Sequence, residues 1–157
     1  MLIQFQSYLT FENIYIWANF GVLPFWLMLI FIPNSRITQI FVNSVILPLI
    51  LSIAYVYTIY QTILLEEPIF DFFKLYLSLD NLYTIFATES FLLVFWLHFL
   101  ALNLFLGCWV SRDAIKYNIS RGLVFIPLIL IYFTGPVGLV LYWLMRVFYA
   151  KKLGFHD

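Results

Sequence analysis

Four long stretches of apolar residues run through this sequence, and they constrain its fold more than any other feature. They cover about residues 14–32, 40–64, 90–110 and 122–148. A helix needs about 20 apolar residues to cross the roughly 30 Å hydrocarbon layer of a bilayer, so each stretch is long enough to be a membrane span. The sequence therefore predicts an all-α integral membrane bundle of four transmembrane helices, in a single transmembrane domain covering residues 1–157.

The composition supports a membrane environment and excludes several other classes of protein. Only 10% of the residues are charged and 64% are hydrophobic, whereas about a quarter of the residues in a soluble domain are charged. Eight basic and eight acidic residues cancel, so no positive field is present to attract nucleic acid. The single cysteine, Cys108, excludes a disulfide within the chain, and no His, Cys or carboxylate cluster has the spacing of metal ligands. We expect membrane lipid around the chain, no nucleic-acid partner and no metal site.

The N-terminal region indicates a permanent helix rather than a removable signal. No Lys or Arg precedes the first apolar stretch, and Glu12 is the first charged residue. A signal peptide would begin with positive charge and end with a cleavage site of small residues. No transit sequence is evident either, so we expect a bacterial or organelle-encoded protein that crosses a bacterial inner membrane or a thylakoid membrane several times.

The segment between the second and third apolar stretches has the pattern of an amphipathic helix. Asp71, Lys74 and Ser78 recur at helical spacing in an otherwise apolar run. Such a segment is typical of a helix that lies in the membrane interface, or packs over helix ends as a lid.

The basic residues do not predict an orientation if the chain crosses the membrane four times. Four of them would then lie on each side, so the positive-inside rule gives a tie. Arg146, at the end of the fourth stretch, is expected to extend its long side chain to the lipid head groups. The two groups are Arg36, Arg112, Lys116 and Arg121 on one side, and Lys74, Arg146, Lys151 and Lys152 on the other.

Polar side chains in the third stretch are candidates for function, because polar groups at membrane depth are costly unless they are paired or used. Glu89, Trp96 and Asn103 recur every seven residues and share one helix face. His98 lies near the middle of the span. It could transfer protons, or it could be a neutral imidazole bonded across helices. Asn103 is expected to bond to another helix, and Glu89 either functions or benefits from the helix N-terminus.

The fourth stretch contains the sequence Thr134-Gly135-Pro136-Val137-Gly138. Pro136 cannot donate the backbone hydrogen bond that the carbonyl of Tyr132 would accept, so a kink is expected there. Such a kink could open a cavity or could be purely structural. Aromatic residues make up 22% of the chain, which suits a long conjugated or polyprenoid ligand as well as ordinary packing.

Several blocks of the chain resemble the ABA4-like family of small membrane proteins. They are ESFLLVFWLHFLALNLFLGCW from Glu89 to Trp109, the following SRDAIKYNIS, the later GPVGLVLYWLMR, and the opening ENIYIWANFGVLPFWLMLIFIPNSR. The positions that match the family pattern are Glu89, His98, Arg112, Asp113, Gly135 and Pro136. Family members commonly carry an acidic residue where this chain has Asn103, and an amide cannot move a proton as a carboxylic acid can.

The resemblance implies a link to carotenoids, because plant members of the family are implicated in neoxanthin synthesis. That reaction isomerises the epoxide of violaxanthin to an allenic alcohol and balances without a redox cofactor, so no cofactor is expected. The reaction needs an acid and a base, and the resemblance suggests His98 and Glu89 as this catalytic pair. Ligand contacts are expected from Trp96, Asn103, Arg112, Asp113, Tyr132, Gly135 and Pro136.

Two other functions are compatible with the same residues. One is a non-enzymatic membrane module that binds a pigment or lipid, or that assembles or protects a membrane complex, and the change at Asn103 favours it. The other is a homo-oligomer that forms a channel or transporter around a polar path. A coloured ligand that stays chemically unchanged would indicate the first, and copurifying subunits would indicate an assembly role.

Overall fold

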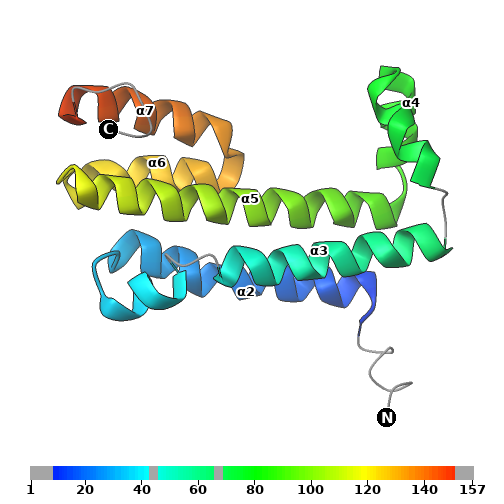
Figure 1. Cartoon of the computed structure of the whole chain (residues 1–157), viewed down its shortest axis with the longest axis horizontal. Helices are drawn as coiled ribbons and strands as arrows, with labels where there is room; N and C mark the ends of the chain where they lie inside the picture. The colour runs from blue at the N-terminus through cyan, green and yellow to red at the C-terminus, as the bar shows by residue number, and fades with distance from the viewer. Residues whose placement is uncertain (1–8, 43–45, 66–68, 151–157) are drawn as a thin grey trace, which may run out of the picture. The chain divides into compact units, whose positions relative to one another are not determined.

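The computed structural model describes residues 9–42, 46–65 and 69–150, and these ranges contain helices and no strand. The prediction of an all-α fold is therefore confirmed for the described residues. Figure 1 shows the elements in chain order. They are α2 (Phe11–Phe31), the short π-helix η1 (Thr38–Val42), α3 (Ile46–Leu65), the 3₁₀-helix η2 (Ile69–Tyr76), α4 (Leu79–Phe86), α5 (Glu89–Lys116), α6 (Arg121–Thr134) and α7 (Pro136–Ala150).

Three helical stretches of the described chain are long and apolar enough to cross a membrane. They are Phe11–Phe31, Thr38–Thr62 and Glu89–Lys116, close to the first three predicted spans. In the most apolar part of each stretch, 56% of the α5 residues are buried, against 28% in α2 and 20% in Thr38–Thr62. The α5 helix is therefore the most buried of the three, whereas most residues in the apolar windows of the other two are not buried.

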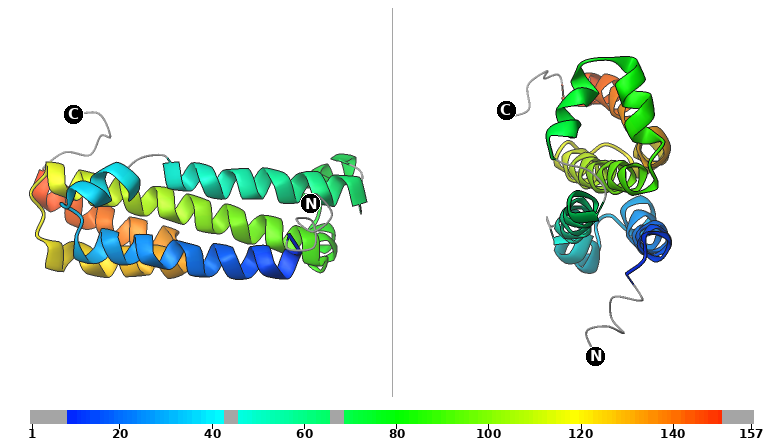
Figure 2. Two further views of the ribbon diagram at one scale, coloured as in Figure 1. Left: turned by 90° about the horizontal axis from the view of Figure 1, so that it is seen from below. Right: turned by 90° about the vertical axis from the view of Figure 1, so that its right-hand side faces the viewer.

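The prediction of one kinked helix over residues 122–148 was wrong. The chain forms two helices there, α6 with 14 residues and α7 with 15, and Figures 1 and 2 show them side by side and antiparallel. Gly135 has a φ of 62° and its N–H bonds to the carbonyl of Ile131, which closes α6. Pro136 then begins α7, a position that suits its fixed φ and missing N–H. Each helix is shorter than the roughly 20 residues that a span requires, so the four-span count is not confirmed.

Two further segments differ from the sequence-based boundaries. The α5 helix continues to Lys116, past the predicted end near residue 110. The connecting segment is helical as expected and consists of η2 and α4, which pack together. Ser78 does not lie on a polar stripe but caps α4, because its hydroxyl accepts a hydrogen bond from the N–H of Asn81. Lys74 is exposed, the side chain of Asp71 lies outside the described residues, and the lid role stays a prediction.

The chain divides into two compact units, which are described separately below. Unit 1 comprises Met1–Phe20 with Leu49–Ala101, and unit 2 comprises Gly21–Pro48 with Leu102–Asp157. Unit 1 holds the beginnings of α2 and α5, most of α3, and all of η2 and α4. Unit 2 holds the ends of α2 and α5, η1, and the α6–α7 hairpin.

The hairpin changes the distribution of positive charge. Because α7 runs back along α6, Arg146 lies beside Asp113 near the end of α5, with its Nε 2.7 Å from the Asp113 carboxylate. Arg36 and Arg121 belong to the same unit, and Lys116 ends α5. Arg146 therefore groups with Arg112 and Lys116, from which the four-span count had separated it.

We expect the end of α5 that carries Lys116 to face the cytoplasm when the protein is made in a bacterium. The test labels single cysteines with a membrane-impermeant maleimide in a Cys108→Ala background. Tyr83→Cys, on exposed α4, should react in intact spheroplasts. Ile37→Cys, also exposed, should react only after lysis. The reverse pattern would contradict the orientation.

Candidate functional site

Unit 1 contains a groove of about 470 Å³ between the beginnings of α2 and α5. Two carboxylates, Glu12 and Glu89, line it together with the rings of Tyr15 and Trp96. Three apolar side chains complete the wall, namely Phe11, Leu92 and Leu93. The groove thus combines an aromatic and aliphatic surface with two acidic groups, the usual composition of a small-molecule site.

The aromatic wall of the groove is held in place by hydrogen bonds. The indole Nε1–H of Trp96 donates to Oδ1 of Asn19 over 3.1 Å, and the Nδ2 of Asn19 donates to the carbonyl of Tyr15 over 2.7 Å. The rings of Tyr15 and Trp96 lie 6.1 Å apart at 42°, and Phe99 stacks on Trp96 at 5.3 Å. Because Asn19 fixes the indole, the groove keeps its shape before a ligand arrives.

Both carboxylates of the groove stand in the first turn of a helix. Glu12 is in the first turn of α2 and Glu89 in the first turn of α5. The positive end of a helix dipole favours negative charge at these positions. Both side chains are exposed, and the ends of spanning helices lie at the membrane interface. Such carboxylates can accept hydrogen bonds from hydroxyl groups or remove protons.

The predicted catalytic pair is not brought together. His98 is exposed on α5, and its ring lies 5.8 Å from that of Tyr55. Glu89 and His98 are nine residues apart, about 14 Å along the helix at 1.5 Å per residue. Glu89 and Trp96 line the groove and His98 faces outward, so the acid–base role of His98 stays a prediction.

Asn103 contacts the turn between α6 and α7 in unit 2. It is 7% exposed, and its Oδ1 lies 2.5 Å from where a Cβ on Gly135 would stand. Its Nδ2 is buried and has no hydrogen-bond partner in the described structure. Asn103 and Gly135 are thus brought together as neighbours, but among the described residues the Nδ2 of Asn103 does not make the expected hydrogen bond to another helix.

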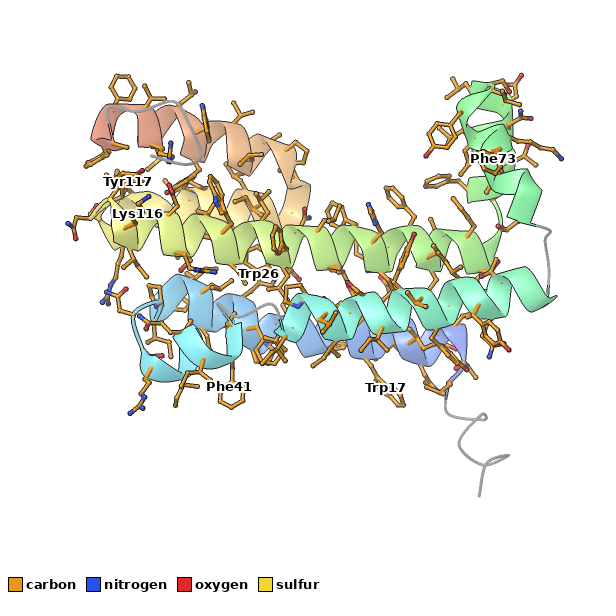
Figure 3. All side chains as sticks on the ribbon, in the orientation of Figure 1. Trp17, Trp26, Phe41, Phe73, Lys116 and Tyr117 are labelled. Carbon is orange, nitrogen blue, oxygen red and sulfur yellow. The ribbon has the colours of Figure 1, made fainter. Side chains whose placement is uncertain are left out.

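Tyr132 and Trp26 form part of the packing of unit 2. The Trp26 ring meets Tyr132 edge-on at 5.4 Å and fills the space above Gly107, where a Cβ would stand 2.6 Å from the indole. Trp26 is 3% exposed and Figure 3 places it beside α5. By contrast, Trp17 is 54% exposed and points outward from α2. The abundant aromatic residues therefore serve both buried packing and the outer surface.

Asp113 and Arg146 form a buried ion pair between α5 and α7. Arg146 is 0% exposed, so the expectation that it reaches the lipid head groups was wrong. The hydroxyl of Tyr142 also donates to the Asp113 carboxylate over 2.7 Å. The guanidinium lies 4.8 Å from the ring centre of Tyr117 and 5.2 Å from that of Trp143. Asp113 therefore holds the hairpin to α5, a structural role.

Arg112 lies apart from this ion pair. It is exposed and lines a shallow cleft with Gln39, Ile115 and Lys116. Figure 3 labels Lys116 at the end of α5, next to Tyr117. The neighbouring positions 112 and 113 thus differ in surroundings: Arg112 is exposed, whereas Asp113 is buried in an ion pair. The ligand contacts expected of both stay predictions.

Sequence reasoning missed the polar contribution of α2 to the groove. Glu12 and Tyr15 line it, and Asn19 holds its Trp96 ring. Tyr15 and Asn19 follow Glu12 by three and seven residues, which puts all three on one helix face. Glu89 and Trp96 have the same seven-residue spacing on α5. Two matching polar faces on separate helices were a signal in the sequence, but nothing in the sequence showed that these faces meet.

The described chain combines helices long and apolar enough to cross a membrane with an acidic, aromatic-lined groove between the beginnings of α2 and α5. Residues 13–142 match the model of the ABA4-like family, described as ABA DEFICIENT 4-like. The chain therefore belongs to the ABA4-like family, and the resemblance seen in the sequence is confirmed.

One similar relative is Protein ABA DEFICIENT 4, chloroplastic, from Arabidopsis thaliana. It is 28% identical over 115 residues, which cover 68% of this chain and 52% of the relative. The chain thus spans about half the length of this curated relative. No solved structure matches. The relative is a plant protein, so the expectation of a bacterial origin gains no support from it.

Proposed function

We propose that this protein binds a carotenoid in a thylakoid or bacterial inner membrane and isomerises its epoxidised end group. The observation that carries the proposal is the groove of unit 1, in which Glu12 and Glu89 meet an aromatic wall. Membership of the ABA4-like family supports a carotenoid as the ligand.

The groove suits the chemistry of an oxygenated carotenoid. Such a molecule has a long apolar polyene and a ring that carries hydroxyl or epoxide oxygens. A ring hydroxyl can donate a hydrogen bond to either carboxylate, while the ring packs on Tyr15 and Trp96. The polyene would continue along the apolar surface of the spans, where it replaces lipid at little cost.

The two carboxyl groups can supply the proton transfers of an epoxide-to-allene isomerisation. An acid protonates the epoxide oxygen as its C–O bond breaks, and a base removes a vinylic proton so that the electron pair forms the allene. One proton is added and one removed, so the product is an isomer of the substrate. We assign these roles to Glu12 and Glu89, with Glu89 as the base. His98 would take part only through a ligand on the outward face of α5.

A second candidate function is carotenoid binding without chemistry, in a module that stores pigment or protects a membrane complex. Asn103 favours it, because a buried amide stands where the family commonly has an acidic residue. The amide cannot exchange a proton, and its Nδ2 is unpartnered in the described structure. In this case the groove would hold the end ring and leave it unchanged.

We expect expression in a violaxanthin-producing bacterium to yield an allenic pigment, detected by pigment chromatography. Glu89→Gln keeps the shape of the side chain but cannot accept the proton, so the yield should fall at least about 100-fold. Asp80→Asn, a change of the same charge on exposed α4, should leave the yield unaltered. Immunoblotting of the membrane fraction checks that all variants are present in equal amount.

The outcomes separate the two candidate functions. A copurifying violaxanthin that remains unchanged, and that is lost in Glu89→Gln, indicates binding alone. No new pigment and no bound pigment, with the protein present in the membrane, would refute both. If Glu89→Gln and Asp80→Asn lowered the pigment yield equally, the groove would not be the site of the reaction.

A further inference from the structure

A second, smaller pocket in unit 2 lies where α2 and α5 end and α6 begins. Its volume is about 190 Å³, several times the roughly 30 Å³ that one water occupies in the liquid. Apolar side chains of α2, α5 and α6 form part of its wall. Its polar lining consists of Asn34, Ser111, Asn118, Ser120 and Arg121.

Ser111 is the buried polar residue of this lining. It is 2% exposed, and its hydroxyl has no hydrogen-bond partner in the described structure. Hydroxyls elsewhere in the helices bond to the carbonyl four residues earlier, as Thr58 does to Ala54 and Thr62 to Thr58. Ser111 makes no such bond, although an unsatisfied buried hydroxyl is costly. Its donor is available to a group bound in the pocket.

The N-terminus of α6 opens on the same pocket. Ser120 occupies the capping position, but its side chain makes no capping bond, unlike Ser78 on α4. The first N–H groups of a helix lack helical partners, and the helix dipole makes this end positive. Arg121 adds a cation at this end, where the dipole disfavours positive charge. The N–H of Leu123 bonds to the carbonyl of Ser120, so a bound anion would accept hydrogen bonds from the N–H groups of Arg121 and Gly122, and its charge would offset that of Arg121.

The charges around the pocket also favour an anion. Among the described residues that line the pocket, none carries a carboxylate, and Asp113, on the same helix as Ser111, is already paired with Arg146. The cleft that contains Arg112 and Lys116 adjoins the pocket, since Ile115 lines both. The surroundings of the pocket are therefore basic.

We infer that this pocket binds a tetrahedral oxyanion, a phosphate or sulfate group. The N-terminus of α6, the Ser111 hydroxyl and the Arg121 guanidinium would hold it. The pocket lies at the end of the spanning helix α5, hence at the depth of lipid head groups. The anion has two candidate sources, the head group of an anionic lipid and free phosphate in solution.

Thermal unfolding of the full chain in a neutral maltoside detergent tests this site. The probes are dihexanoyl-phosphatidylglycerol, dihexanoyl-phosphatidylcholine and sodium phosphate at matched ionic strength. A ligand that binds the folded state raises the Tm with its concentration. A rise with phosphatidylglycerol but not with the other two identifies a lipid head group. An equal rise with sodium phosphate identifies the free ion, and no rise with either anion overturns the proposal.

One variant and one matched control locate the site. Arg121→Gln should weaken the apparent affinity about tenfold. Arg36→Gln removes the same charge from an exposed residue outside the lining and should leave the affinity within about twofold. Equal weakening by the two changes would overturn the proposal, because it would indicate unspecific attraction.

Ser111→Ala separates a loss of anion binding from a loss of protein stability. Removing an unsatisfied buried hydroxyl should leave the Tm of the ligand-free protein unchanged or higher. The same change should lower the affinity for the anion several-fold, since it removes one hydrogen-bond donor. An undiminished ligand-induced rise in Tm would remove Ser111 from the site and overturn the assignment.

Discussion

Replacing Arg146 by leucine should destabilise the protein by about 3–5 kcal/mol, because the buried Asp113 carboxylate then loses its cation. The two side chains are 0% and 9% exposed, and the bond joining them is 2.7 Å long. The Arg146 Nη2 also donates to the Tyr117 hydroxyl over 3.2 Å. The free energy of unfolding can be followed by tryptophan fluorescence during titration of mixed micelles with SDS.

A double-mutant cycle separates the ion pair from general effects of substitution. Asp113→Leu combined with Arg146→Leu should recover most of the stability lost in either single variant, because no unpaired charge remains buried. Arg112→Leu is the matched control, since it removes an exposed cation one position away on α5. It should change the unfolding free energy by less than about 0.5 kcal/mol. Additive single and double effects would show that the pair is not coupled.

Sequence alone was sufficient for the long helices and insufficient for the short ones. Uninterrupted apolar stretches of about 20 residues predicted α2, α3 and α5, because membrane length sets a simple requirement. The stretch 122–148 met the same requirement but contains Gly135-Pro136. A Pro after several helical turns indicates a kink, while a Pro directly after a left-handed Gly begins a new helix. The choice depended on the φ of Gly135, which tertiary packing decides.

The candidate sites show the same division between local and long-range information. Glu89 and Trp96 were found because their spacing on one helix is visible in the sequence. Their partners Glu12 and Asn19 were missed, since pairing of α2 with α5 is a long-range contact. The sequence-based prediction separated Arg146 from the end of α5 for a related reason. An incorrect topology put it far from Asp113, so the ion pair could not be anticipated.

Gly138→Ala should weaken the α6–α7 hairpin by about 2–3 kcal/mol, because the added methyl group has no room. A Cβ on Gly138 would stand 2.5 Å from the carbonyl oxygen of Pro127 and 2.6 Å from Cγ1 of Ile131, and it would also meet the backbone nitrogen of Ile131. Two of these three atoms belong to the backbone of α6, so the clash is relieved only if the helices separate.

Gly21→Ala is the matched control, because a Cβ there would have nothing within 4 Å. Alanine is the better helix former, so this change should leave the protein as stable or raise its stability by up to about 1 kcal/mol. Both variants are compared by SDS titration and by limited proteolysis of the hairpin. If Gly138→Ala behaves like Gly21→Ala, α6 and α7 do not pack closely at Gly138. The hairpin that brings Arg146 to Asp113 would then lack the close contact of Gly138 with Pro127 and Ile131.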